Sequence, residues 1–234
     1  MEKLENKLIK LSPSTLHLFL ECPRCFWLEK AKDIKRPRGI FPSLPSGMDR
    51  VIKIYFDGFR SARTLPTEFA HDDLKGIVLF DDQDRLDKWR SWRTGLVYQD
   101  EMSGASLSGA LDDLLVKDGK YIPFDYKTKG SMTTEKDAVK YYQNQLDVYA
   151  LLLESNGLPT TGYGFLLYFS PKSVQQSGTV HFELQPIKIT TDIERARQVF
   201  RNAVSLLKGP LPPINQNCEY CAWLRKFKIR SDGS

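Results

Sequence analysis

A two-residue turn constrains the fold of this chain more than any other feature. Asp118-Gly119 separates two apolar-rich runs, and these residue types tolerate the positive φ angles of a type I′ hairpin turn. Counting backwards and forwards from the turn places Asp112 directly opposite Asp125. The sequence therefore predicts a β-hairpin on which two carboxylates face each other.

The facing carboxylates indicate a cation site. Like charges directly opposite each other destabilise a sheet, unless a divalent cation such as Mg²⁺ or Mn²⁺ lies between Asp112 and Asp125. Lys127 shares the face of Asp125, whereas Asp113 points to the other face. A metal here would hold a phosphate and lower the pKa of bound water, while the lysine orients that water or offsets charge. Pro123 indicates an edge strand or a bulge, which would shift the register by one residue.

The remaining apolar periodicity predicts an α/β layered fold with a mixed sheet. A Ser-Pro-Ser helix start precedes Thr15, and the sequence Thr191-Asp192-Ile193-Glu194 is a capping box for a helix that runs to about Lys208. The expected helices lie near 15–20, 46–62, 135–156 and 192–208, the expected strands near 93–100, 107–116, 121–128, 163–169 and 179–189, and a proline-rich loop at 34–45.

Three motifs together resemble the PD-(D/E)XK nuclease superfamily. They are Gly109-Ala110-Leu111-Asp112, Asp125-Tyr126-Lys127-Thr128 and Gln145-Leu146-x-x-Tyr149. The nearest resemblance is to the RecB nuclease domain, to AddB and to the CRISPR-associated exonucleases that carry an iron–sulfur cluster. It implies a restriction-endonuclease-like fold, with a mixed central sheet flanked by helices. It also implies that Asp112, Asp125 and the Tyr126 carbonyl bind the metal, that Lys127 assists catalysis, and that Gln145 and Tyr149 lie beside the active site.

Two parts of this resemblance have alternative interpretations. Gln145 and Tyr149 share a helix face because they are four residues apart, so they are also expected if the helix only packs on the sheet. The family places a metal-binding His before the hairpin, where this chain has Asp49. Asp49 is either a replacement ligand for a hard cation or an acidic residue favoured near a helix N-terminus. His71, in a segment with loop character, is a poorer candidate.

Two Cys-x-x-Cys pairs predict a second metal centre. Cys22 with Cys25 and Cys218 with Cys221 have the spacing at which two thiolates bind one metal, provided that the two ends of the chain meet. The resemblance implies a structural 4Fe-4S cluster. The iron–sulfur nucleases usually have one more Cys after the last pair, where this chain has Phe227. Zinc held by the same four cysteines is therefore the alternative, and unligated or disulfide-bonded cysteines are a third.

The length of 234 residues suits a single nuclease domain, 1–234. Within it, segments 12–31 and 210–226 would form a metal-cluster subdomain around a core at 46–208. The net charge of +5 is compatible with a polyanionic partner. The stretch from Lys88 to Arg93 alternates cations with Trp89 and Trp92, either to bind single-stranded nucleic acid or to bury both tryptophans on one helix face.

These features predict a Mg²⁺- or Mn²⁺-dependent deoxyribonuclease that acts on single-stranded DNA or DNA ends, as an exonuclease rather than an endonuclease. The alternative is an inactive nuclease-fold protein that serves as a DNA-binding or assembly subunit. Repair or CRISPR adaptation proteins are the expected protein partners. No apolar run is long enough to span a bilayer, and Met1 to Lys10 lacks the apolar core of a signal peptide, so we expect a cytoplasmic location and no membrane partner.

Overall fold

The structure is a computed structural model that describes residues 8–37, 39–67 and 74–231. It divides into two compact units. The first contains Met1–Ile40, Gln99–Leu107 and Arg197–Ser234, and the second contains Phe41–Tyr98 and Ser108–Ala196. The predicted single domain with a metal-cluster subdomain stays a prediction. No helix within the described ranges is long and apolar enough to cross a membrane.

The second unit is built on a five-stranded mixed sheet with the strand order β2-β5-β6-β7-β8. Its central pair, β6 and β7, is parallel, and the other neighbours are antiparallel. The mixed central sheet of the expected fold is confirmed. Its strands are β2 (Val78–Leu79), β5 (Asp113–Lys117), β6 (Lys120–Thr128), β7 (Tyr163–Val174) and β8 (Val180–Thr190).

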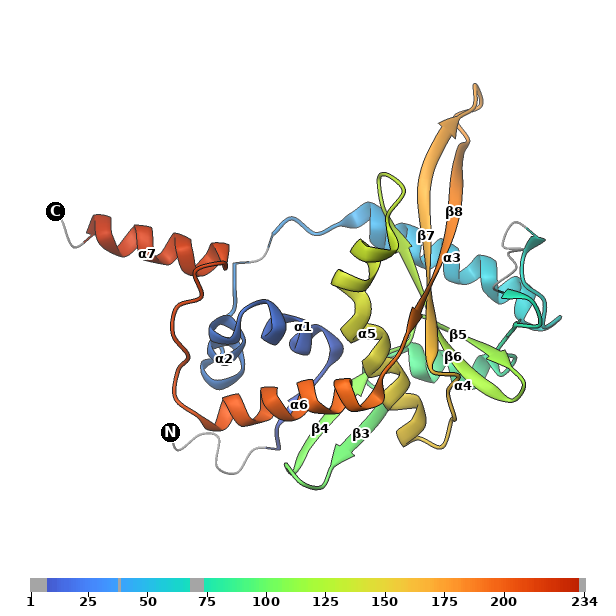
Figure 1. Cartoon of the computed structure of the whole chain (residues 1–234). Coiled ribbons are helices and arrows are strands. Elements are labelled where there is room, and N and C mark those ends of the chain that lie inside the picture. Colours follow the sequence, from blue (N-terminus) through green and yellow to red (C-terminus); the bar gives the residue numbers. More distant parts are fainter. Residues whose placement is uncertain (1–7, 38, 68–73, 232–234) are drawn as a thin grey trace. The chain divides into compact units, whose positions relative to one another are not determined.

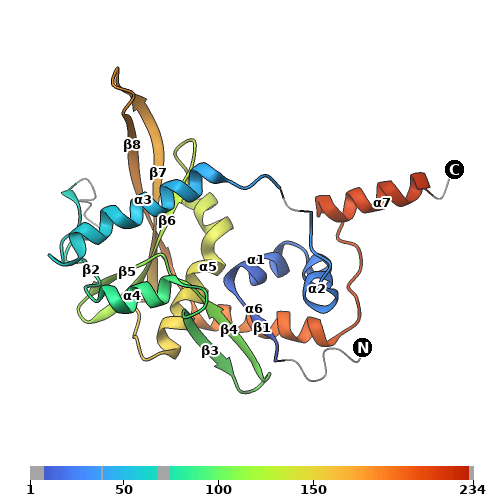
Figure 2. The same ribbon diagram turned by 180° about the vertical axis from the view of Figure 1, so that it is seen from behind.

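Helices cover both faces of this sheet. Helix α3 (Ser43–Arg60) packs Ile52 and Phe56 against one face, where Phe124 and Tyr126 of β6 are buried. Helix α5 (Glu135–Ser155) contacts β6, β7 and β8, and it lies in front of the sheet in Figure 1, whereas α3 lies in front in Figure 2. Because alternate residues of a strand point to opposite faces, α5 covers the face that carries Asp125.

The predicted hairpin is present with the predicted register. Asp118 and Gly119 have φ angles of 49° and 73°, as a type I′ turn requires. The pairing runs from Lys117↔Lys120 to Asp113↔Phe124, where β5 begins. Asp112 therefore lies one position before the paired strand, in line with Asp125.

The prediction of one strand over 107–116 is wrong. Two strands occupy this region, β4 (Ala105–Gly109) and β5, and residues 110–112 between them are not in a strand. Helix α4 (Gln83–Arg90) explains the break, because it takes up the backbone groups that a strand would use. The Leu111 N–H donates to the Trp89 carbonyl at 3.0 Å, and the Arg90 side chain donates to the Asp112 carbonyl at 2.8 Å.

Pro123 lies in the central strand of the sheet, so the predicted edge or bulge is wrong. Its pairing with Leu114 continues the regular register. In a hairpin with a two-residue turn this is a pair without hydrogen bonds, so the proline nitrogen points away from β5. The ladder with β7 begins only at Phe124↔Phe165. The missing N–H therefore leaves no ladder hydrogen bond unmade.

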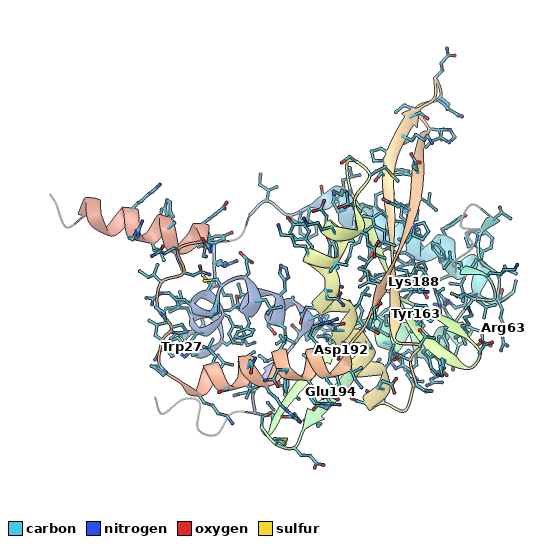
Figure 3. The ribbon with its side chains drawn as sticks, viewed as in Figure 1. Trp27, Arg63, Tyr163, Lys188, Asp192 and Glu194 are labelled. Carbon is cyan, nitrogen blue, oxygen red and sulfur yellow. The ribbon has the colours of Figure 1, made fainter. Side chains whose placement is uncertain are left out.

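The helix that follows β8 begins one residue later than the predicted capping box indicates. Helix α6 (Ile193–Lys208) is capped by Asp192 instead of Thr191. Asp192 Oδ1 accepts the N–H groups of Glu194 and Arg195 at 2.9 and 3.0 Å, and Figure 3 labels Asp192 and Glu194 at the start of this helix. The same end is held by the buried Asp147 of α5, which accepts two hydrogen bonds from the Arg195 guanidinium.

The first unit brings together segments from both ends of the sequence. Helices α1 (Pro13–Glu21) and α2 (Pro23–Lys32) follow each other directly, with Cys22 between them. Trp27 of α2 donates its indole N–H to the Gly209 carbonyl at 3.1 Å, and Arg24 donates to the Pro212 carbonyl at 2.6 Å. Helix α7 (Glu219–Ser231) was not predicted, and β1 (Lys10–Leu11) and β3 (Leu96–Asp100) join β4 in a small sheet.

Candidate active site and cysteine centre

Asp112 and Asp125 meet where β5 begins beside β6, the central strand of the five-stranded sheet. Asp125 is fully buried on β6, and the two carboxyl groups are close enough to share a hydrogen bond when one of them is protonated. Asp125 Oδ2 is buried and finds no hydrogen-bond donor of suitable geometry among the described residues. A buried, incompletely satisfied carboxylate oxygen is costly, and binding a cation would satisfy it.

Lys127 contacts Asp125 on the same face of β6. Its Nζ lies 2.5 Å from Asp125 Oδ2, in an ion pair without hydrogen-bond geometry, and donates to Gln145 Oε1 at 3.3 Å. The same ammonium lies 4.5 Å from the ring centroid of Tyr142. Burial opposes the charged form of Lys127, but Asp125 and Asp112 outweigh it and raise its pKa. Lys127 therefore stays a cation in a fixed position.

Gln145 and Tyr149 join this cluster from α5. Gln145 Nε2 donates to Asp125 Oδ1 at 2.9 Å and to the Tyr149 hydroxyl at 2.7 Å. Gln145 thus contacts both the buried carboxylate and Lys127, so it does more than line the rim of a packed helix. The pKa of Tyr149 is well above its usual value, because burial and the nearby Asp125 and Asp112 disfavour a phenolate. Tyr149 is a neutral group at the end of this network.

Asp49 lies near the site but contacts a lysine that the sequence did not single out. Lys53 Nζ is 2.9 Å from Asp49 Oδ2 and 2.8 Å from Asp112 Oδ1. Among the described residues, Asp49, Asp112 and Asp125 do not gather their oxygens into a three-ligand group. The role of Asp49 as a metal ligand stays a prediction. His71 lies outside the described residues.

The charges at this site change the protonation of both aspartates. Burial raises the pKa of Asp125 to about 7, although Lys127 acts against that rise. Burial also disfavours the charged form of Asp112, but Lys53 and Lys127 outweigh it and lower its pKa. Below about pH 7 Asp125 therefore holds a proton, which a divalent cation would displace.

Asp113, which follows Asp112 directly, belongs to a buried hydrogen-bond network on the other face of the sheet. Asp113 is fully buried and accepts hydrogen bonds from Arg60 at 2.7 Å, from Arg90 at 3.1 Å and from the Tyr126 hydroxyl. This places it on the α3 face, as alternation along the strand predicts. Arg60 also donates to the Phe80 carbonyl at 2.7 Å. The network fixes the start of β5 and so the position of Asp112.

A pocket of about 240 Å³ opens beside the site. Asp49, Lys127 and Tyr126 are among its lining residues, with Pro45, Ile52 and Thr128. Lys127 lines this space from β6, and Asp49 lines it from α3. A group with a negative charge would be attracted to the lysine at short range.

The four cysteines form a single buried cluster in the first unit. Cys22 Sγ lies 3.7 Å from Cys221 Sγ, and Cys25 Sγ lies 3.7 Å from Cys218 Sγ and 4.0 Å from Cys221 Sγ. All four sulfurs lie within 4.8 Å of one another, and none forms a disulfide. The predicted meeting of the N- and C-terminal pairs is confirmed, and the disulfide alternative is not seen.

The Arg36 guanidinium contacts this cluster directly. Arg36 donates to Cys218 Sγ at 3.3 Å, pairs with Glu21 at 2.7 Å and lies over the Tyr220 ring at 4.6 Å from its centroid. Burial raises the pKa of the Cys25 thiol to about 12. Although burial acts the same way on Cys218, hydrogen bonds from the Cys221 backbone and from the other cysteines lower its pKa to about 7. The cluster therefore contains one readily formed thiolate.

The tryptophan-rich stretch does not bury both rings on one helix. Trp89 of α4 stacks on Phe80 with ring centroids 5.4 Å apart and lies under Arg85. Trp92 lies beyond the end of α4 and is 77% exposed, with the Arg93 guanidinium 4.9 Å from its ring. Expecting both tryptophans on a single buried face is therefore wrong for Trp92, because the helix stops at Arg90.

A family model described as the PD-(D/E)XK nuclease superfamily matches residues 51–225. The chain belongs to this superfamily. The matched range contains Asp112, Asp125, Lys127 and the Cys218 pair, but it begins after Asp49 and after the first cysteine pair. Membership and the observed mixed sheet together confirm the fold that the three motifs predicted.

Two solved structures are similar to this PD-(D/E)XK protein over nearly its whole length. The crystal structure of SSO0001 is 16% identical, with a TM-score of 0.49, and covers 94% of this chain and 86% of its own. The structure of LHK-Exo in complex with dAMP is 10% identical, with a TM-score of 0.43, and covers 96% of this chain and 94% of its own. At these values neither bears on substrate or chemistry. Comparison with curated proteins found no significant match.

Proposed function

We propose that this member of the PD-(D/E)XK superfamily is a Mg²⁺- or Mn²⁺-dependent DNA nuclease. The observation that carries the proposal is the buried, incompletely satisfied Asp125 Oδ2 beside Asp112 and Lys127. Oxygen ligands of this kind suit a hard divalent cation. We assign Asp112, Asp125 and the backbone carbonyl of Tyr126 as its ligands. Once bound, such a cation supplies an activated water and charge neutralisation for phosphodiester hydrolysis.

The protein's own residues then have separate roles. Lys127 holds a positive charge where the attacked phosphate gathers negative charge, which stabilises that charge in a partly buried site. Gln145 donates to Asp125 Oδ1 and accepts a hydrogen bond from Lys127. It therefore holds the carboxylate and the ammonium in fixed positions relative to each other. Tyr149 holds Gln145 in place through its hydroxyl.

The preferred substrate in this proposal is single-stranded DNA or a DNA end, cut as by an exonuclease. Support comes from the resemblance to the RecB, AddB and iron–sulfur exonuclease branch, and from the exposed Trp92 with its neighbouring Arg93, because single-stranded DNA binds to such surfaces by stacking and phosphate contacts. The same resemblance makes repair or CRISPR adaptation proteins the partners that we propose.

The cleavage experiment uses end-labelled linear single-stranded DNA and a circle of the same sequence, each with Mn²⁺. The natural sequence should shorten the linear DNA and spare the circle, and Asp125→Ala should do neither. Equal cleavage by both proteins would refute the assignment of the site. Tight DNA binding without cleavage in Mg²⁺ or Mn²⁺ would instead support an inactive binding or assembly subunit.

We further propose that Cys22, Cys25, Cys218 and Cys221 hold one structural metal centre. A tetrahedral zinc with bonds of about 2.3 Å separates its sulfurs by about 3.8 Å, and the sulfurs of this cluster lie 3.7 to 4.0 Å apart where they contact. A 4Fe-4S cluster interposes four irons and four sulfides and would hold the thiolates further apart. The spacing therefore favours zinc, whereas the resemblance favours 4Fe-4S.

Metal analysis of an anaerobic preparation distinguishes zinc from a 4Fe-4S cluster at the four cysteines. One zinc per chain in a colourless protein is the result that the sulfur spacing predicts. Four irons with acid-labile sulfide and a brown colour would overturn zinc and place the chain in the iron–sulfur branch. Cysteine-to-serine changes at Cys22 and Cys221 should abolish either centre and lower the stability of the first unit.

A further inference from the structure

We propose that Lys53 takes the place of a second metal ion in this site, so that the site binds one divalent cation and Asp49 serves to hold Lys53. The inference rests on the proposed function, because it concerns the metal stoichiometry of the same site. It gives Asp49 a role other than that of a ligand. It also identifies a positioning residue, Lys53, that no motif of the chain marks.

The geometry carries the first step. Lys53 Nζ bridges two carboxylates, at 2.9 Å from Asp49 and 2.8 Å from Asp112. In two-metal nuclease sites a second cation lies about 3.5–4 Å from the first and neutralises the same ligands. The Lys53 ammonium bridges two carboxylates in the same way and would neutralise them as a second cation would. Asp49 and Lys53 are one helical turn apart on α3, so the helix holds the pair in this register.

The second step concerns the position at which the single divalent cation binds. Asp125 is completely buried, and its Oδ2 finds no hydrogen bond within the described part of the chain. Asp112 is the shared member, because it contacts Lys53 and also lies within hydrogen-bonding reach of Asp125. One cation between Asp112 and Asp125 would give Asp125 Oδ2 a ligand bond in addition to its ion pair with Lys127. The Asp49 carboxylate already has its partner in Lys53.

The charges decide the stoichiometry. Asp49, Asp112 and Asp125, when ionised, together with Lys53 and Lys127, leave one net negative charge. One divalent cation turns this into one net positive charge, which suits an approaching phosphodiester. A second cation would leave three positive charges within a partly buried site, which is strongly unfavourable at the short distances involved. Without the Lys53 charge, two divalent cations would leave a net charge of only two positive units at the site.

The test is a Mn²⁺ titration of the full chain, followed by electron paramagnetic resonance of free Mn²⁺ and by calorimetry. Lys53→Gln removes the charge and keeps much of the length, and Lys53→Arg is the matched control that keeps the charge. The natural sequence and Lys53→Arg should each bind one Mn²⁺. Lys53→Gln should bind a second Mn²⁺, or bind the first about tenfold more tightly or better, because a nearby positive charge is gone. Thermal unfolding of each variant verifies that it is folded.

Two results would overturn the inference. One is a natural sequence that already binds two Mn²⁺ at this site, and the other is Lys53→Gln with the same stoichiometry and affinity as the natural sequence. Asp125→Asn separates this failure from failure of the proposed function. If Asp125→Asn loses Mn²⁺ binding while Lys53→Gln changes nothing, only the role of Lys53 is wrong. If Asp125→Asn binds Mn²⁺ like the natural sequence, the metal site itself is wrong.

Discussion

Asp125 Oδ2 lies 2.5 Å from Lys127 Nζ, yet it receives no hydrogen bond of suitable geometry from the described residues. A carboxylate that is fully buried and only partly paired destabilises the protein that contains it. Such local cost is typical of sites that are built to bind a ligand or to perform chemistry.

The stability of the metal-free protein should fall as the pH rises from about 4 to about 7. Folding raises the pKa of Asp125 from its ordinary value of 3.8 to about 7, so the folded protein binds a proton in this range that the unfolded chain has lost. Stability then decreases with pH and the penalty is complete above pH 7. Thermal melts in EDTA across this range measure it. Asp125→Asn should lack this component of the profile, and an identical profile for both proteins would contradict the account.

Mn²⁺ should stabilise the natural sequence at pH 8 and should cease to do so at pH 5. The cation must displace the proton that Asp125 holds below about pH 7. A cation at one hundred times its dissociation constant adds about 2.7 kcal/mol to the free energy of unfolding. Differential scanning calorimetry with and without Mn²⁺ measures the shift in Tm. A shift of the same size at both pH values would show that the cation binds elsewhere.

Asp113→Asn should strongly destabilise the fold. Asp113 is fully buried against Arg60 and Arg90, and removal of one partner from a buried ion pair typically costs about 3–5 kcal/mol. Urea unfolding measures the free energy of unfolding. Asp84→Asn, at an exposed position of α4, is the matched control and should change it by less than about 0.5 kcal/mol. A loss below about 1 kcal/mol for Asp113→Asn would mean that the network contributes little.

The hairpin register could be predicted because it depends on local chemistry. Asp118-Gly119 sets the turn, and the turn sets which side chains face each other down to Asp113↔Phe124. The break at 110–112 could not be predicted, because it depends on hydrogen bonds to α4, which is distant in sequence from the hairpin turn. Lys53 was missed for the same reason. Its contact with Asp112 joins residues 59 positions apart, and only the packing of α3 against the sheet brings them together.

The cysteine centre was predicted in its ligands but not in its surroundings. Two Cys-x-x-Cys pairs are a strong local pattern, whereas nothing near Arg36 in the sequence indicates that its guanidinium reaches Cys218. Helix α7, which carries Cys221, has no clear periodicity of apolar residues, so the sequence does not predict it as a helix. Its position depends on the cysteine cluster, which is a long-range constraint.

Arg36→Gln should weaken the cysteine centre without removing any ligand. The Arg36 guanidinium donates to Cys218 Sγ at 3.3 Å and offsets the negative charge that four thiolates bring to a metal. Loss of such an outer contact typically lowers metal affinity about 10–100-fold. Competition with a chromogenic chelator measures the affinity for zinc, and Arg36→Lys keeps the charge as a control. Equal affinity for the natural sequence and both variants would show that Arg36 does not support the centre.

The most direct measurement is the rate at which the natural sequence cleaves linear single-stranded DNA in Mn²⁺, compared with Asp125→Asn and with Asp84→Asn. We expect cleavage by the natural sequence and by Asp84→Asn, complete inhibition by EDTA, and a loss of about 10³-fold or more for Asp125→Asn, which corresponds to about 4 kcal/mol of activation free energy. Cleavage that continues in EDTA, or that proceeds equally in Asp125→Asn, would contradict the assignment of this site as a metal-dependent nuclease centre.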